Sequence, residues 1–167
     1  MSQKNPIPFV DFIASFPKIE LPITLTDSSI HIFNQENDPF SEQMILEYLV
    51  PLDGEEMDEF TEYTPCFALD QTYDILAVVF WKASLLNHQY ILATFSKKAE
   101  LIDKKVIAGT FSDGKVLIQS VATIDEDWEI LIVSGQKPAS DNFRFDPAKS
   151  TTQKFEILPE GQIVSIP

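Results

Sequence analysis

One stretch of sequence decides the fold: Tyr73-Asp74-Ile75-Leu76-Ala77-Val78-Val79-Phe80-Trp81-Lys82. From Ile75 to Trp81 every residue is apolar, and β-branched and aromatic residues predominate. A short apolar run of this kind, bounded by polar residues, is typical of a strand that is buried on both faces. We therefore expect a central strand here, with most later segments forming strands beside it.

The chain from Glu62 onward is predicted to be an antiparallel meander, because its apolar segments are separated by short turns. Asp113-Gly114 is a strong hairpin signal, since Gly tolerates a positive φ. About eight strands are expected, near Tyr63–Leu69, Tyr73–Lys82, Gln89–Phe95, Glu100–Ala108, Lys115–Ile124, Trp128–Ser134, Thr151–Leu158 and Gln162–Ile166.

The N-terminal part is predicted to contain two short helices. In Phe9–Phe16 the apolar residues recur at helical spacing between Pro8 and Pro17, which indicates a helix packed on the core. The second helix would begin at Asp38-Pro39 and stop before Pro51, although alternation from Met44 to Val50 also fits a strand. Two short strands are expected at Leu21–Thr26 and Ile30–Phe33.

These elements predict a mainly β protein with one domain, residues 1–167. A helical and acidic part, residues 1–61, would pack on an up-and-down meander, residues 62–167. The meander would be either bladed, as in a propeller, or barrel-like.

Charge is unevenly distributed along the chain. The formal net charge is −14, and the span from Ile19 to Trp81 holds 14 of the 26 acids but none of the 12 Lys and Arg residues. Nucleic acid and anionic membrane surfaces are disfavoured as partners, because both are bound by clustered cations. The span would attract a basic protein partner or a hard cation, or it is a solvated face that keeps the protein soluble.

Six acids lie close together just before the meander, and we predict that they form an acidic interaction face: Asp53, Glu55, Glu56, Asp58, Glu59 and Glu62. Their order does not match an EF-hand calcium loop, since Gly54 follows Asp53 directly. Weak cation binding and a plain solvated loop are the alternatives.

The segment from Gly135 to Ser150 is long for a connection in a compact domain, and long loops are often functional or mobile. Phe143, Arg144 and Phe145 lie within it, and two Phe residues indicate that it folds back onto the body. We interpret these residues as a candidate lid over a ligand.

Known catalytic and metal-binding patterns are missing from the sequence, so we predict no catalytic residue, no metal and no cofactor. His31 and His88 lack metal-ligand spacing, and the single cysteine, Cys66, is expected to be a small buried hydrophobe. A nucleophilic pair of Cys66 and His88 would need a proximity that sequence does not show.

Carboxylates on hairpins offer the strongest enzymatic alternative. Asp125–Glu129 places four acids beside Trp128, and Asp70 and Asp74 flank another hairpin. A glycosidase needs two carboxylates held across a sugar together with aromatic platforms. Acids also favour turns for local hydrogen bonding, which is the commoner role.

Four hairpins share one cadence, in which an apolar residue precedes a four-residue turn, an acid or amide follows, and two apolar residues come next. They are Phe67–Leu76, Ala93–Ile102, Ala122–Leu131 and Phe155–Val164. This cadence resembles the bladed sheets of β-propeller-like proteins, including bacterial proteins of no known function. The resemblance implies stacked or radially arranged β units and carries over no site residues.

Three functions are consistent with these patterns. The first is a non-catalytic binding or interaction protein with an acidic face. The second is a small-ligand-binding β-barrel with residues 135–150 as its lid, and the third is a hydrolase that uses hairpin carboxylates. The N-terminus has no apolar segment of a secretory signal and the cysteine count indicates no oxidising compartment, so the default localisation is cytoplasmic. Sequence patterns leave the oligomeric state open.

Overall fold

A computed structural model describes residues 5–55, 57–69, 74–85, 87–138 and 150–167. Its strands are β1 (Lys18–Ile19), β2 (Ile23–Leu25), β3 (Glu62–Leu69), β4 (Ile75–Ala83), β5 (Asn87–Ser96), β6 (Leu101–Ser112), β7 (Val116–Ile124), β8 (Glu129–Pro138), β9 (Thr151–Ile157) and β10 (Ile163–Ile166). Its helical segments are α1 (Phe9–Ala14), α2 (Ser29–Glu36), α3 (Glu42–Met44), the π-helical turn η1 (Ile45–Leu49) and α4 (Val50–Asp53).

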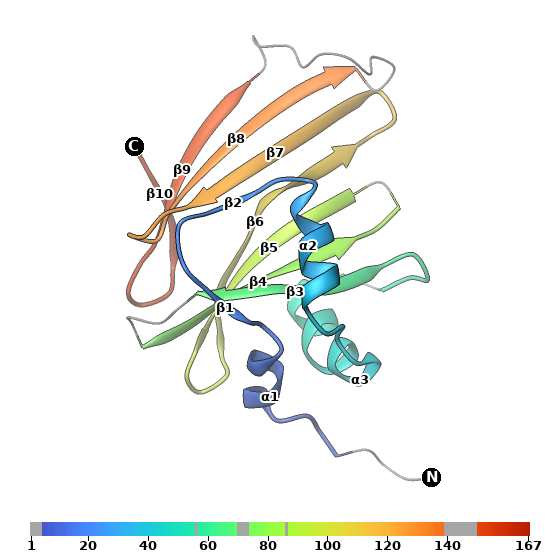
Figure 1. Cartoon of the computed structure of the whole chain (residues 1–167), viewed down its shortest axis with the longest axis vertical. Coiled ribbons are helices and arrows are strands. Elements are labelled where there is room, and N and C mark those ends of the chain that lie inside the picture. Colours follow the sequence, from blue (N-terminus) through green and yellow to red (C-terminus); the bar gives the residue numbers. More distant parts are fainter. Residues whose placement is uncertain (1–4, 56, 70–73, 86, 139–149) are drawn as a thin grey trace.

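All ten strands belong to one sheet (Figure 1), with the hydrogen-bonded order β1-β3-β4-β5-β6-β7-β8-β9-β10 and with β2 paired to β7. Every pair of neighbours from β3 to β10 is antiparallel, and only short connections separate most of them. The predicted antiparallel meander is therefore confirmed, and each of its expected strands is observed. The sheet is open, because its order runs from β1 to β10 without closing.

The apolar run of β4 is buried on both faces, as predicted. Ile75 and Val79 belong to a core cluster that also includes residues of α2, β2 and β7. Val78 and Phe80 point the other way, into a second cluster with residues of α1, η1 and α4. Because successive side chains of a strand alternate between faces, two cores require an uninterrupted apolar sequence.

Helix α1 packs on the second of these cores, which confirms the expected helix near residues 9–16. Phe12 is 1% exposed, and its ring stacks on Tyr48 with 4.6 Å between centroids. The ring of Phe16 meets Phe12 edge-on. Figure 1 shows α1 and α3 lying on the same side of the sheet, close to the β3 end.

The strand predicted at Ile30–Phe33 is wrong, because these residues belong to α2. Ile30 and Phe33 are three residues apart, and both are buried against the sheet from one side of the helix. The amide of Thr26 donates a hydrogen bond to Oγ of Ser29 at the start of the helix. Polar residues such as Asp27 and Ser28 favour helix N-termini as well as turns, so the local signal had two readings.

The helix predicted to stop before Pro51 instead continues to Asp53. In a regular α-helix the ring of Pro51 would clash with the carbonyl group four residues earlier. The π-helical turn η1 widens the helix at this point, and the amide of Val50 bonds to the carbonyl of Ile45. The helix ends at Gly54, whose φ of 76° suits a residue without a side chain.

The sheet divides along the part of β6 that precedes Gly109, because those residues pair with β5 but not with β7. Gly109–Ser112 pairs with β7, whereas the other end of β7, Ala122–Ile124, pairs with β2. Gly109 has a φ of 142°, and a Cβ atom there would lie 1.9 Å from the backbone oxygen of His88. This position therefore requires glycine. Residues Ala122–Ile124 of β7 do not pair with β6, and β2 pairs with them instead.

The turn between β9 and β10 folds back onto β5 and β6. Oγ1 of Thr94, which is fully buried, donates a hydrogen bond to the carbonyl of Gly161 at 2.6 Å. The amide of Ile163 donates to Oδ2 of Asp103 at 2.9 Å. These side-chain bonds bring the turn before β10 against the middle of the sheet.

Candidate functional site

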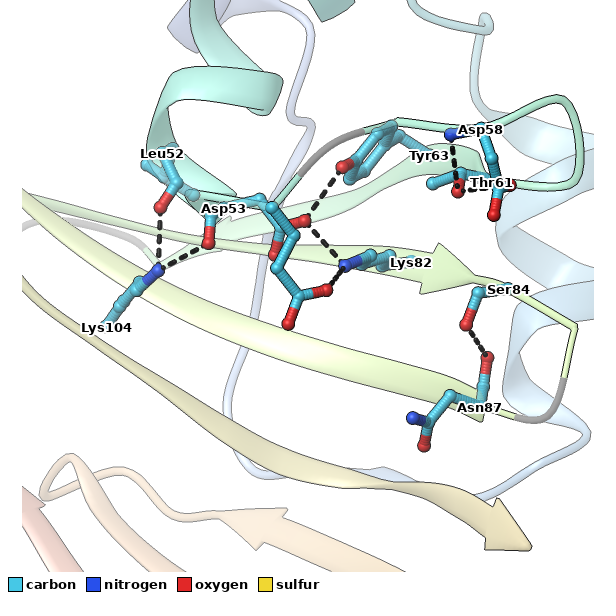
Figure 2. Close-up of polar contacts among 10 residues, drawn as sticks. Leu52, Asp53, Asp58, Thr61, Tyr63, Lys82, Ser84, Asn87 and Lys104 are labelled. Atoms are coloured by element: carbon cyan, nitrogen blue, oxygen red, sulfur yellow. Dashed lines mark hydrogen bonds and ion pairs between the residues drawn. The ribbon is translucent and has the colours of Figure 1, made fainter. Parts of the chain in front are cut away.

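The predicted acidic face lies on the connection between α4 and β3, which we call the acidic loop (residues 53–62). Its beginning is fixed by the end of α4 at Asp53 and Gly54, and its end by the start of β3 at Glu62. Glu56 lies outside the described residues. Figure 2 shows the polar contacts that hold the remainder of this loop against β4 and β6.

Lys82 of β4 anchors the beginning of the acidic loop from beneath. Its Nζ is 2.5 Å from Oδ2 of Asp53 and 2.8 Å from Oε2 of Glu55. The side chains of Lys82 and Asp53 are each 9% exposed, whereas that of Glu55 is 75% exposed. The hydroxyl of Tyr63 donates a further hydrogen bond to Oδ2 of Asp53. Asp53 is therefore a buried structural group.

The electrostatics of this anchor are consistent with a charged Lys82. Burial alone lowers the pKa of its ammonium group, but hydrogen bonds and charge from Asp53 and Glu55 outweigh burial and raise the pKa above its ordinary value. The hydrogen bond from Lys82 lowers the pKa of Glu55. Burial, together with the negative charge of Asp53, raises the pKa of Tyr63.

A second lysine, Lys104 of β6, caps the C-terminal end of α4. Its Nζ donates to the carbonyl of Leu52 at 2.8 Å and to that of Asp53 at 3.0 Å. Carbonyl groups at the end of a helix have no partner within the helix, and a cation there also interacts favourably with the helix dipole. Two lysines from neighbouring parts of the sheet thus fix the start of the acidic loop.

The far end of the acidic loop is held by a turn centred on Asp58. Oδ1 of Asp58 accepts hydrogen bonds from the amide of Phe60 at 2.8 Å and from the hydroxyl of Thr61 at 2.9 Å. These bonds, with the amide of Phe60 contributing most, lower the pKa of Asp58. Thr61 is buried, so the turn is tied to the body of the protein.

Between these two attachments the acidic loop presents both acids and apolar side chains to solvent. Met57 is 42% exposed and Phe60 is 54% exposed. Asp58, Glu59 and Glu62 are exposed beside them. The structure thus separates the predicted face into anchoring residues, Asp53 and Glu55, and outward-facing residues. Sequence reasoning missed the two apolar residues, although they stand between the acids.

Lys82 was also missed, although a signal for it exists in the sequence. It is the first cation after the long span without Lys or Arg, and it directly follows the buried run of β4. A cation at the end of a buried strand needs a carboxylate partner, because charged groups are rarely buried unpaired. The acidic loop and the hairpin acids Asp70 and Asp74 are the carboxylates that precede it most closely in sequence, and the acidic loop supplies the partners.

Other candidate residues do not join this site. The predicted lid residues Phe143, Arg144 and Phe145 lie outside the described residues. Cys66 is fully buried, and burial raises the pKa of its thiol, which is the opposite of what a nucleophile needs. His88 is exposed, and its ring contacts Trp81.

The hairpin carboxylates serve their own turns. Oδ1 of Asp125 accepts hydrogen bonds from the amides of Asp127 and Glu129, both at 2.9 Å. Asp74 is exposed and lies 3.4 Å from Lys97 on the protein surface, while Asp70 lies outside the described residues. Within the described ranges, no group of three or more acid, histidine or cysteine side chains is arranged to hold a metal ion.

Comparisons with protein-family models, with curated proteins and with solved structures find no match to this chain. Among the described residues, no helix has the length and apolar character needed to cross a membrane.

The raised pKa values at the anchor predict how stability depends on alkaline pH. Tyr63 and Lys82 both keep their protons in the folded state at a pH where the unfolded chain, with ordinary values of about 10 and 10.4, loses them. The stabilisation that these two groups contribute is therefore fully present below a pH of about 10. As the pH rises further, the free energy of unfolding falls by up to about 1.4 kcal/mol per pH unit for each group.

Urea unfolding between pH of about 9 and 11 measures this loss, and Tyr63→Phe should make it shallower. Tyr90, whose pKa is also raised by burial, is present in both proteins, so the difference isolates Tyr63. Equal slopes for the two proteins would contradict the prediction.

Proposed function

We propose that this protein is a non-catalytic interaction protein that binds a basic protein partner through its acidic loop. The proposal rests on one observation: Met57 and Phe60 are exposed among acids on a loop whose ends are fixed by internal bonds. Large apolar side chains on a fixed loop are suited to binding, because little conformational entropy is lost when a partner contacts them.

The charge of the surrounding surface supports a basic partner. Lys82, the cation closest to the acidic loop in the structure, is buried and already paired with Asp53. Glu59 and Glu62 are exposed at the surface, where acidic side chains would accelerate encounter with a cationic segment. Met57 and Phe60 would supply the apolar contacts that slow dissociation. The expected partner therefore carries Lys or Arg on both sides of an apolar side chain.

Affinity capture from a lysate of the source organism tests this proposal, with three forms of the protein compared at salt concentrations of about 50 mM and 500 mM. The forms are the natural protein, a loop variant with Met57→Ala and Phe60→Ala, and a control variant with Val10→Ala and Leu85→Ala. Val10 and Leu85 are 70% and 72% exposed, so the control removes similar apolar surface elsewhere.

A supporting partner is retained by the natural protein and by the control at low salt, is released at high salt, and is not retained by the loop variant. The purified partner should then bind the loop variant at least about tenfold more weakly, since truncating apolar anchors commonly costs more than 1 kcal/mol. A second pair separates charge from apolar contact: Glu59→Gln with Glu62→Gln should reduce binding, whereas Glu36→Gln with Asp38→Asn should not. Retention that ignores the loop variants, or no partner at either salt, would refute the proposal.

A further inference from the structure

The sheet carries a cavity whose lining includes no residue of the acidic loop. It has a volume of about 160 Å³, and residues of β5 to β9 line it. Its floor includes Ile107 and Ile132 of the main core, and its wall includes the partly exposed Phe111 and Ile118. A cavity of roughly 150 Å³ in another protein holds a benzene-sized molecule, so this volume suits one small ring or a short branched chain.

The cavity wall contains no acidic residue. The chain has 26 acids, yet none of the residues that line the cavity is Asp or Glu. One lining residue is a cation, Lys105. The acid that contacts the lining is Asp27, whose Oδ1 accepts a hydrogen bond from Thr110 at 2.7 Å. An anion would therefore meet less repulsion here than beside the acidic loop.

Lys105 is held in place without a carboxylate partner. Its Nζ lies 3.9 Å from the centroid of the Phe155 ring, a cation–π contact between β6 and β9. None of the described carboxylates forms an ion pair with Lys105, whereas Lys82 pairs with two carboxylates and Lys97 with one. Lys105 thus lines the cavity with an ammonium group whose hydrogen-bond donors no described carboxylate occupies.

Neutral donors complete the lining. The hydroxyls of Ser120 and Ser134 are 2.7 Å apart, and whichever donates to the other, one hydroxyl hydrogen remains available. Gln153, which lies opposite Ile132 on the neighbouring strand, also lines the cavity, and its side-chain amide forms no hydrogen bond with the described residues. An ammonium, a hydroxyl and a primary amide can all donate hydrogen bonds to a carboxylate.

We propose that this cavity binds a small organic carboxylate whose apolar body is about the size of one ring. Lys105 pairs with the carboxylate, and one hydroxyl of the serine pair donates a second hydrogen bond to it. The apolar body lies against Phe111, Ile118 and Ile132. This site is independent of the acidic loop, so either proposal stands if the other fails.

The test measures binding to the full chain by two-dimensional NMR with five probes. Benzoate and hexanoate carry both a carboxylate and an apolar body. Benzyl alcohol lacks the charge, benzylammonium reverses it, and inorganic phosphate lacks the apolar body. We expect the two carboxylates to bind saturably with a Kd of about 1 mM or below and to shift the amide signals of β6, β7 and β8, and we expect the other three to bind at least about tenfold more weakly.

Two variants place the carboxylate within the cavity. Lys105→Met keeps the aliphatic stem and removes the charge, and Gln153→Glu puts a carboxylate on an exposed strand position that lines the cavity. Each should weaken benzoate binding by about tenfold or more, whereas Lys154→Met, an exposed lysine on the same strand, should leave it unchanged. The proposal is overturned if benzyl alcohol binds as tightly as benzoate, if both cavity variants bind normally, or if neither carboxylate saturates below about 10 mM.

Discussion

Lys82→Met is expected to lower the free energy of unfolding by about 3–5 kcal/mol, because it leaves a buried carboxylate without its counter-charge. The Asp53 side chain is 9% exposed, and Lys82 is its one cationic side-chain partner among the described residues. Tyr63 would still donate one hydrogen bond to Asp53, but a single neutral donor cannot replace an ammonium group at 2.5 Å. Urea unfolding monitored by tryptophan fluorescence measures the loss.

Two further variants establish whether burial is the cause. Lys97→Met removes a lysine that is 58% exposed and pairs with the exposed Asp74, so it should cost less than about 1 kcal/mol. Adding Asp53→Asn to Lys82→Met removes the orphaned charge, so the double variant should be more stable than Lys82→Met alone. If Lys82→Met costs no more than Lys97→Met, the anchor contributes little to stability.

Gly109→Ala is expected to destabilise the protein by about 3 kcal/mol or more, or to prevent folding altogether. The new Cβ would lie 1.9 Å from the carbonyl oxygen of His88, which belongs to the backbone of β5. That strand cannot move away locally, because Gln89 and Tyr90 pair with Gly109 and Ala108 of β6. A φ of 142° is also unfavourable for alanine.

Gly114→Ala provides the matched control for this effect. Gly114 also has a positive φ, of 90°, but a Cβ there would meet no atom within 4 Å. Its substitution should therefore cost only the conformational strain, about 1–2 kcal/mol. Soluble yield and urea midpoints of the two variants distinguish close approach from strain. Similar losses for both would show that the contact with His88 relaxes easily.

Much of the meander could be predicted because its signals are local. Alternating apolar residues and short turns such as Asp113-Gly114 define β6 and β7 within a few residues of sequence. The continuous apolar run of β4 also predicted a strand with two buried faces. Prediction failed at α2 and at Pro51, where polar turn residues and a proline have more than one structural use. There the outcome depends on packing against the sheet and on the π-helical turn, neither of which leaves a local pattern.

The candidate site could be located in the sequence but not understood from it. The sequence shows the acids of the acidic loop. It does not show which of them are anchors and which are exposed, because that depends on contacts with Lys82 of β4 and Lys104 of β6. The cavity is less visible still, since Lys105, Ser120 and Ser134 lie on three different strands. Ser120 lies opposite Ser134 only because β7 pairs with β8, and Lys105 is contributed by β6, so no single stretch of sequence shows the cavity.

The pairing of β2 with β7 has a consequence for how the chain folds as it is synthesised. Leu25 is opposite Ala122, so the N-terminal strand leaves the ribosome long before its partner exists. Contacts this distant in sequence close large loops, and proteins dominated by them fold slowly for their size. Until β7 emerges, the edge that β2 presents stays unpaired and open to association with other nascent chains. We therefore expect protection by chaperones during translation to matter more for this protein than for a helical protein of equal length.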